Sequence, residues 1–474
     1  MGISRITTRV TATVAVGMLT LFAASGPVAA QPLPSADAEL GFAKPPPLPD
    51  GTPTPTDSGK PDLPYVQKTQ CVRSLNETVD LPNKPWGQTQ LRFDELHKFA
   101  TGKGQRVAVI DTGVNRHDFL GDRLSGGGDY VSDKNGLEDC DGHGTEVAGI
   151  IAANPGDPNI GFKGIAPDAS IVSIRQSSAN YSGKDPNDPN AGDRTAGNLL
   201  TLAQAIVNAA DKNVGVINMS VDNCRLAGPI TQPEVAVQAA LRYAVEVHNV
   251  VVVASAGNLS EGGCNQQNGP DSNRPTTIVT PPWFSDYVIS VAAMEKSGDP
   301  ASFSVQGPWV GVAAPGTEII SLDPGNPKGL ANLLLTKDNK QSPIQGTSFA
   351  APYVAGLAAL VRDRYKNLNA KQVMNRIKVT ASHPAATGGH DNLVGHGMIN
   401  PIGALTAMIP SEQGIPPDQP TKITFEASAP VERNWTPVRV ALIGAAGGVG
   451  LLLLTLFVVH TVRTSRRNRG FPVD

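Results

Sequence analysis

The chain reads Val109-Ile110-Asp111-Thr112-Gly113 at the end of an apolar run, a pattern typical of a buried parallel strand. Functional groups of α/β sheets gather beyond the carboxyl ends of such strands, and Asp111 falls at that position. Two further motifs follow, each at the start of a predicted helix: Asp141-Gly142-His143-Gly144-Thr145 and Gly346-Thr347-Ser348-Phe349-Ala350-Ala351-Pro352.

The three motifs supply a carboxylate, an imidazole and a hydroxyl in the order Asp, His, Ser, which is the order of subtilisin. A serine hydroxyl is a weak nucleophile until an imidazole takes its proton, and a carboxylate fixes the tautomer of that imidazole. We therefore assign Ser348 as nucleophile, His143 as general base and then acid, and Asp111 as the group that orients His143. The helix start at Ser348 also offers free backbone N–H groups to a developing oxyanion.

A second oxyanion donor is predicted from the run Val250–Ser255, which reads as a buried strand and continues as Ala256-Gly257-Asn258. The amide of Asn258 can donate a hydrogen bond where the backbone does not reach, so Asn258 is the candidate.

Each motif has a simpler explanation when taken alone. Asp-Thr-Gly also marks aspartic peptidases, but these need a second copy on a strand, and Asp57-Ser58-Gly59 lies in a proline-rich stretch. His143 between two glycines is compatible with a turn, and Gly-Thr-Ser with an ordinary helix cap. The combination of all four elements in this order favours a serine peptidase.

Residues 90–408 resemble the subtilase family, and within it the mycosins, the membrane-anchored proteases of mycobacterial type VII secretion systems. The narrower resemblance rests on three segments: His97-Lys98-Phe99-Ala100-Thr101-Gly102, Asp185-Pro186-Asn187-Asp188-Pro189-Asn190-Ala191 and Gly307-Pro308-Trp309-Val310. The resemblance implies proteolysis of secreted protein substrates outside the plasma membrane. It also implies partners among the membrane subunits of the secretion complex, with a structural role there as the alternative function, in which proteolysis is dispensable.

In the resembled fold, an extended substrate pairs with the backbone after Val216–Ser220 and beside Ala254–Gly257. The expected substrate-binding residues are Ser220, Ala254, Ser255, Ala256 and Gly257.

The predicted strands alternate with predicted helices across residues 91–408, which indicates an α/β domain. We expect the subtilisin-like three-layer fold, with a mostly parallel central sheet and helices on both faces. The stretch Gln176–Gly197 reads as an insertion loop. Its acidic residues fit no EF-hand spacing, so a solvated loop is favoured over a calcium site.

Residues 1–30 are predicted to be a cleaved signal peptide, with Arg5 and Arg9 ahead of an apolar run and small residues at Val28-Ala29-Ala30. An uncleaved anchor is the alternative. Residues 31–90 form a proline-rich extension, too polar to fold alone, and we expect it to wrap around the protease rather than act as an inhibitory domain.

Export to an oxidising compartment permits two disulfides among four cysteines, with three possible pairings. Cys224 and Cys264 each follow one of two neighbouring parallel strands that end at the same sheet edge, so we pair them and join Cys71 to Cys140. The second bond closes a loop of about seventy residues and stabilises the fold by ~4 kcal/mol in the chain-entropy model. A four-cysteine zinc site lacks any C-x-x-C spacing.

Residues 409–437 are predicted to be a proline-rich linker, and 438–460 a transmembrane helix, since Val440–Val459 holds twenty residues without a charge. The arginines in the tail, residues 461–474, place it in the cytoplasm and the protease on the periplasmic side of the plasma membrane, in a single pass.

The formal charge is −3, from 39 basic and 42 acidic residues, which gives nucleic-acid binding no electrostatic support. No metal site and no cofactor are expected.

Overall fold

The computed structural model describes residues 41–72, 84–188, 190, 192–269, 273–335, 341–414 and 435–468. It divides the chain into two compact units, residues 1–414 and 415–474. The predicted signal peptide at 1–30 lies outside the described residues, as do most of the predicted linker and the end of the tail.

The first unit is built on a seven-stranded sheet in which every neighbouring pair of strands is parallel. This confirms the predicted parallel sheet. The strands, in spatial order, are β12 (Val310–Pro315), β11 (Ile289–Met294), β9 (Val251–Ser255), β7 (Val216–Met219), β2 (Arg106–Asp111), β4 (Ser170–Arg175) and β3 (Leu124–Asp129).

The order of the strands reverses at β2. The chain passes from β2 to β3 and β4 on one side, and then crosses to β7 on the other. In open α/β sheets such a reversal leaves a crevice beyond the carboxyl ends of the central strands, because the connections on the two sides diverge. Asp111 ends β2 at the point where the strand order reverses, and Ser220 follows the adjacent strand β7.

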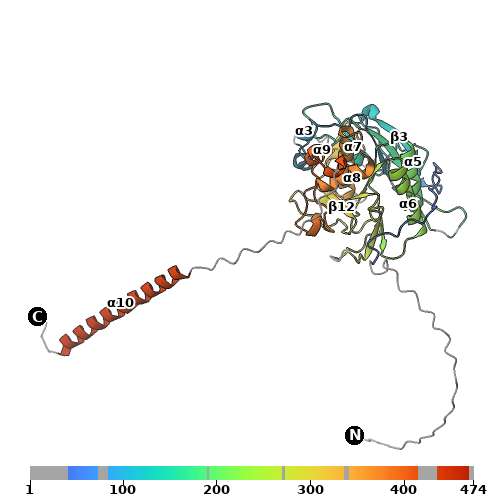
Figure 1. Ribbon diagram of the computed structural model, residues 1–474. Coiled ribbons are helices and arrows are strands. Elements are labelled where there is room, and N and C mark those ends of the chain that lie inside the picture. The colour runs from blue at the N-terminus through green and yellow to red at the C-terminus, as the bar shows by residue number, and fades with distance from the viewer. Residues whose placement is uncertain are drawn as a thin grey trace, which may run out of the picture. The chain divides into compact units, whose positions relative to one another are not determined.

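Helices cover both faces of the sheet, so the predicted three-layer fold is confirmed. On one face, α4 (His143–Ala152) and α7 (Thr347–Arg364) pack against each other, with α8 (Ala370–Val379) and α9 (Pro401–Thr406) against α7 (Figure 1). On the other face, α5 (Leu199–Asp211) packs against α6 (Gln232–Arg242), and α6 continues as a π-helical turn, η2 (Tyr243–Val247).

The remaining elements are short. They are β1 (Val66–Gln67), α2 (Trp86–Gln90), α3 (Phe93–Leu96), η1 (Gly121–Arg123), β5 (Ser178–Gly183), β6 (Arg194–Ala196), β8 (Asn223–Leu226), β10 (Thr277–Thr280), β13 (Ser321–Leu322), β14 (Leu330–Ala331), β15 (Leu333–Leu335), β16 (Gln341–Pro343), η3 (Thr387–Gly389) and η4 (Pro410–Gln413).

The expected insertion loop Gln176–Gly197 is more ordered than its sequence indicates, and the prediction of a plain loop was wrong. It contains the antiparallel strands β5 and β6, and β1 from the N-terminal extension pairs with β5 to make a three-stranded sheet. Val66 lies opposite Ser182 in this sheet. Periodicity along one segment does not reveal a pairing between segments so far apart in the chain.

Within the first unit, the described part of the N-terminal extension lies along the domain that follows it and is held by hydrogen bonds to its backbone and to the side chain of Asp57. Gln238 donates to the carbonyl oxygen of Pro46 at 3.0 Å, and Arg242 to that of Thr52 at 2.8 Å. The carboxylate of Asp57 accepts from Tyr130 at 2.6 Å and from Asn208 at 2.8 Å. An extension without a core of its own is thus ordered by polar contacts with the domain.

Two disulfides are present, and they join the cysteine pairs chosen from the sequence. Cys71 is bonded to Cys140 across a separation of 69 residues, and Cys224 to Cys264 across 40. The first bond ties the extension to the segment just before α4.

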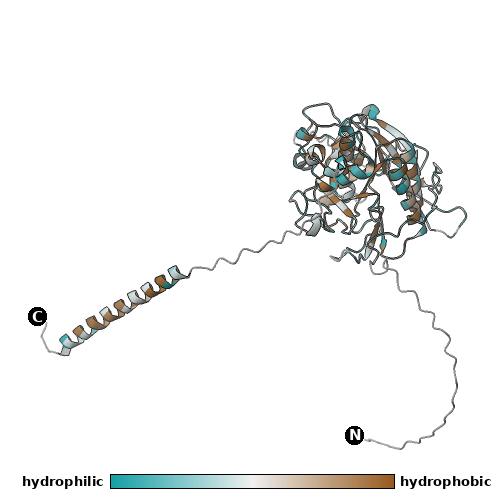
Figure 2. Cartoon of the chain, in the orientation of Figure 1, coloured by the Kyte–Doolittle hydropathy of each residue, from teal (hydrophilic) through white to brown (hydrophobic). Residues whose placement is uncertain are grey.

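The second unit contains α10 (Thr436–Asn468), a helix long and apolar enough to cross a membrane, with a mean hydropathy of 2.4 in its most apolar window. Its apolar residues run along most of its length in Figure 2. The predicted span at 438–460 lies within it.

Helix α7 packs very closely against the segment that follows α4, and Gly356 is the point of contact. A Cβ at Gly356 would lie 1.9 Å from Cγ2 of Ile165. Replacing Gly356 with alanine should therefore destabilise the domain by about 1–3 kcal/mol through overpacking, although alanine favours helices. Thermal unfolding checks this. Gly192→Ala is the control, since nothing lies within 4 Å of its added Cβ. A melting temperature of Gly356→Ala equal to or above that of the wild type would contradict the close packing of Gly356 against Ile165.

Candidate active site

Asp111 and His143 meet at the carboxyl end of β2. Asp111 is fully buried, and its Oδ1 lies 2.7 Å from Nδ1 of His143 and accepts the backbone N–H of Thr112 at 2.7 Å. Gly144 permits this approach, because a Cβ there would lie 2.0 Å from the carbonyl oxygen of Gly113. The structure thus brings together two of the predicted site residues.

A third carboxylate, that of Asp139, joins the end of β2 to the start of α4. It is buried and accepts hydrogen bonds from the Thr112 hydroxyl at 2.8 Å, from the Gly142 N–H at 2.8 Å, and from the N–H and hydroxyl of Thr145 at 2.8 and 2.6 Å. Burial raises the pKa of Asp139 to about 6, while its hydrogen bonds act in the opposite direction. Asp139 was not predicted from the sequence, although an aspartate just ahead of a helix is a recognisable start signal.

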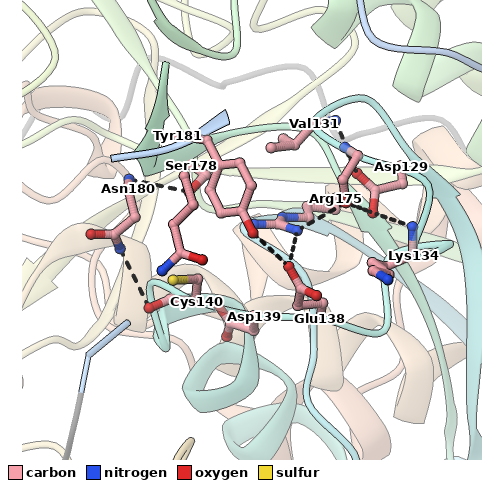
Figure 3. Close-up of polar contacts among 12 residues, drawn as sticks. Asp129, Val131, Lys134, Glu138, Asp139, Cys140, Arg175, Ser178, Asn180 and Tyr181 are labelled. Atoms are coloured by element: carbon pink, nitrogen blue, oxygen red, sulfur yellow. Dashed lines mark hydrogen bonds and ion pairs between the residues drawn. The ribbon is translucent and has the colours of Figure 1, made fainter. Parts of the chain in front are cut away.

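The segment that precedes His143 is also fixed from the side of β4 and β5. Glu138 Oε1 accepts hydrogen bonds from Arg175 and from the Tyr181 hydroxyl, both at 2.9 Å (Figure 3). The Asn180 amide donates to the carbonyl oxygen of Cys140 at 3.3 Å. Because Cys140 is bonded to Cys71, the extension, the β5–β6 hairpin and the histidine segment support one another.

Electrostatics at His143 favour its protonated form. Burial by itself would lower the pKa of His143, but the charge of Asp111 and the hydrogen bond to it raise that pKa, with smaller contributions from Glu146 and Asp139. Glu146 lies one turn further along α4, fully buried, and neither of its carboxylate oxygens has a hydrogen-bond partner among the described residues. Burial raises the pKa of Glu146 well above its ordinary value.

Ser348 lies in the first turn of α7, which packs against α4. Its carbonyl oxygen accepts a hydrogen bond from the Ser220 hydroxyl at 2.7 Å, and the ring of the next residue, Phe349, lies 5.0 Å from the ring of His143. Among the described residues no hydrogen bond joins the Ser348 hydroxyl to His143; such bonds often tighten only when substrate is bound.

Asn258 faces the same point as Ser348. Both Oγ of Ser348 and Nδ2 of Asn258 lie within 3.3 Å of the position that a Cβ on Gly346 would occupy. Oδ1 of Asn258 accepts from the N–H and the hydroxyl of Thr347 at 2.9 and 3.0 Å, which turns the amide nitrogen toward the site. A hydroxyl and an amide donor therefore share one small region beside a glycine that must stay small.

The predicted substrate-binding residues lie at the carboxyl ends of two adjacent strands, β7 and β9. Ser220 follows β7, Ala254 and Ser255 end β9, and Ala256 and Gly257 follow it; all five lie within the first unit and are buried.

Two acidic residues near these strand ends were not predicted as site residues from the sequence. Asp222 accepts a long hydrogen bond from the Ser255 hydroxyl at 3.4 Å, and Glu261 accepts one from the Asn258 amide at 2.9 Å. Burial, followed by the charge of Glu261, raises the pKa of Asp222 to about 7. Asp222 also lies beside Cys224 and Cys264, but these sulfurs are bonded to each other and are not thiolate ligands.

Residues 102–397 match the model of the subtilase family. The chain belongs to the subtilase family. Within it, the chain belongs to the mycosins: it is 42% identical over 430 residues to mycosin-1 of Mycobacterium tuberculosis, a match that covers 86% of this chain and 92% of that protein. The family expected from the motifs is thus confirmed.

Solved structures agree with this assignment. The serine protease MycP1, described as an essential component of the type VII (ESX-1) secretion system, superposes with a TM-score of 0.69 at 44% identity, covering 76% of this chain and 99% of its own. A chain in the intact ESX-5 inner membrane complex gives a TM-score of 0.71 at 37% identity, covering 88% of this chain and all of that one.

The raised pKa of His143 predicts the pH dependence of peptide hydrolysis. A general base must be neutral, so kcat/KM should rise with pH with a midpoint above 6.5, the ordinary pKa of histidine. Asp111→Asn removes the charge that raises this pKa and should move the midpoint of its residual activity to lower pH. Asp211→Asn is the control, because Asp211 lies 3.5 Å from another histidine, His248. An unchanged pH midpoint of kcat/KM in Asp111→Asn would contradict the effect of Asp111 on the pKa of His143.

Proposed function

We propose that this chain is a serine endopeptidase in which Ser348, His143 and Asp111 act as nucleophile, base and orienting carboxylate. The observation that carries the proposal is the 2.7 Å contact between Asp111 and Nδ1 of His143, whose ring lies 5.0 Å from that of Phe349, the residue after Ser348. Ser348 Oγ and Asn258 Nδ2 in turn lie close to one point beside Gly346. Membership of the subtilase family supports the reaction class.

The proposed reaction follows from this geometry. Ser348 Oγ attacks the carbonyl carbon of the scissile bond while Nε2 of His143 takes the hydroxyl proton, and Asp111 stabilises the resulting imidazolium. The backbone N–H of Ser348 and the Asn258 amide donate to the oxygen that becomes negative. His143 then protonates the leaving amine, and a water molecule repeats the sequence to release the acid.

Secreted proteins at the outer face of the plasma membrane are the proposed substrates. In this arrangement 91–408 is the peptidase domain, α10 spans the membrane once, and the basic tail lies in the cytoplasm. The positive-inside rule supports the orientation, because Arg463, Arg466 and Arg467 follow the apolar part of α10. Incubating the exported fragment, wild type and Ser348→Ala, with the organism's secreted proteins and mapping the cuts by mass spectrometry tests the substrate class.

A second function, as a structural subunit of the secretion complex, is favoured by one observation. The solved chain that this protein matches over 88% of its length belongs to an intact inner membrane complex. Co-purification of other membrane subunits with a Ser348→Ala protein would support this role, and it is compatible with proteolysis.

Ser348→Ala and His143→Ala should each abolish turnover while leaving the fold intact, because they remove reacting groups rather than core packing. The corresponding losses in subtilisin, where the magnitude is established, lower kcat by about 10⁶. Asn258→Ala should lower kcat by about 10²–10³ if it donates to the oxyanion. Peptidase assays with matched unfolding curves check this, and full activity in Ser348→Ala would refute the assignment.

The mature protein should keep its N-terminal extension. Because Cys71 is bonded to Cys140, a cut between these two cysteines would leave the extension attached, and we expect the exported chain to begin near Gln31. Non-reducing mass spectrometry should recover linked peptides containing Cys71 and Cys140. A mature chain that begins near Arg92 with a free Cys140 thiol would instead identify the extension as a discarded propeptide.

A further inference from the structure

The Asn258 amide is held at both ends by hydrogen bonds. Its oxygen accepts two from Thr347, and its Nδ2 donates to Oε2 of Glu261 at 2.9 Å. A side-chain amide has two N–H groups, so one can donate to Glu261 while the other remains for the region beside Gly346 that Asn258 shares with Ser348. The contact with Glu261 fixes the rotation of the amide plane as well as its flip.

Glu261 is itself placed by a tight turn. Its backbone N–H donates to the Asn258 carbonyl oxygen at 3.1 Å, and its carbonyl oxygen accepts from the Cys264 N–H at 2.7 Å. The disulfide between Cys264 and Cys224 anchors this turn to the segment that follows β7. A glutamate three residues after Asn258 thus meets the amide through a turn built from backbone hydrogen bonds.

We propose that Glu261 positions the Asn258 amide and that its negative charge slows the reaction of the proposed peptidase. The inference rests on the proposed function, because it assigns to Glu261 an effect on the oxyanion donor. Glu261 is a positioning residue, since it acts through Asn258 and does not reach the reacting atoms.

Positioning of the Asn258 amide and the negative charge of Glu261 change kcat in opposite directions. A fixed donor stabilises the tetrahedral intermediate without reorganisation, which raises kcat. A carboxylate on the same nitrogen lies about 5 Å from the developing oxyanion, given two hydrogen bonds of ordinary length, and it repels that charge. Glu261 is exposed, so water and salt weaken the repulsion. Asp222 adds a second carboxyl group beside the Ser255 hydroxyl.

Two substitutions separate these effects. Glu261→Gln keeps a carbonyl oxygen to accept the Asn258 hydrogen bond but removes the charge, so kcat should rise by about three- to tenfold with little change in KM. Glu261→Ala removes both the acceptor and the charge, so its kcat should fall about tenfold or more below that of Glu261→Gln. Glu246→Gln is the control, because it removes an exposed charge that is paired with Lys371.

The dependence of kcat on ionic strength distinguishes the proposed effect of the Glu261 charge from a purely structural role. Raising the ionic strength should increase kcat of the wild type toward that of Glu261→Gln, because screening weakens the repulsion, while kcat of Glu261→Gln should stay nearly constant. Glu246→Gln should follow the wild type.

The assay uses the exported protein with one cleavable peptide, and Ser348→Ala is measured alongside. An active Ser348→Ala would refute the proposed function. If Ser348→Ala is inactive, the proposal for Glu261 is overturned either by equal kcat values for Glu261→Gln and Glu261→Ala or by a Glu261→Gln kcat no higher than that of the wild type, and the proposed function stands.

Discussion

The alignment of β2 with α4 depends on the buried carboxylate of Asp139. It accepts four hydrogen bonds, which come from Thr112 at the end of β2 and from the first turn of α4. A buried carboxylate is costly unless it is hydrogen-bonded, so these contacts stabilise only the arrangement in which strand and helix are correctly placed. The contact between Asp111 and His143 is a consequence of that placement.

The support for this region extends to parts of the chain that are remote in sequence. Cys140 and Glu138, on either side of Asp139, are held by the N-terminal extension through a disulfide and by β4 and β5 through Arg175 and Tyr181. The extension gains order only by contact with the domain. Because it pairs with the β5–β6 hairpin, it also stabilises the segment that carries His143.

Negatively charged side chains lie near both His143 and Asn258, and their effects on the proposed reaction differ between these two places. Near His143, Asp111 favours the imidazolium, the form of His143 that the proposed reaction generates. Near Asn258, Glu261 orients a donor and also opposes the charge that this donor must stabilise. The rate of such an enzyme thus depends on how these charges are distributed and screened, as well as on the three reacting side chains.

The sequence by itself determined the order of the three motifs that carry Asp111, His143 and Ser348, the strands β2 and β4 to the residue, and the apolar helix near the C-terminus. These features rest on local patterns: continuous apolar runs, small residues at helix starts and charge-free length. It did not reveal β3, where three glycines mask a strand; a Cβ at Gly127 would lie 2.6 Å from Cγ1 of Val172, so the neighbouring strand β4 leaves no room for a side chain at that position. Nor did it reveal the roles of Asp139 and Glu261. Their partners are backbone N–H groups, threonine hydroxyls and a side-chain amide whose positions only the tertiary structure decided, because hydrogen-bond geometry depends on where remote segments pack.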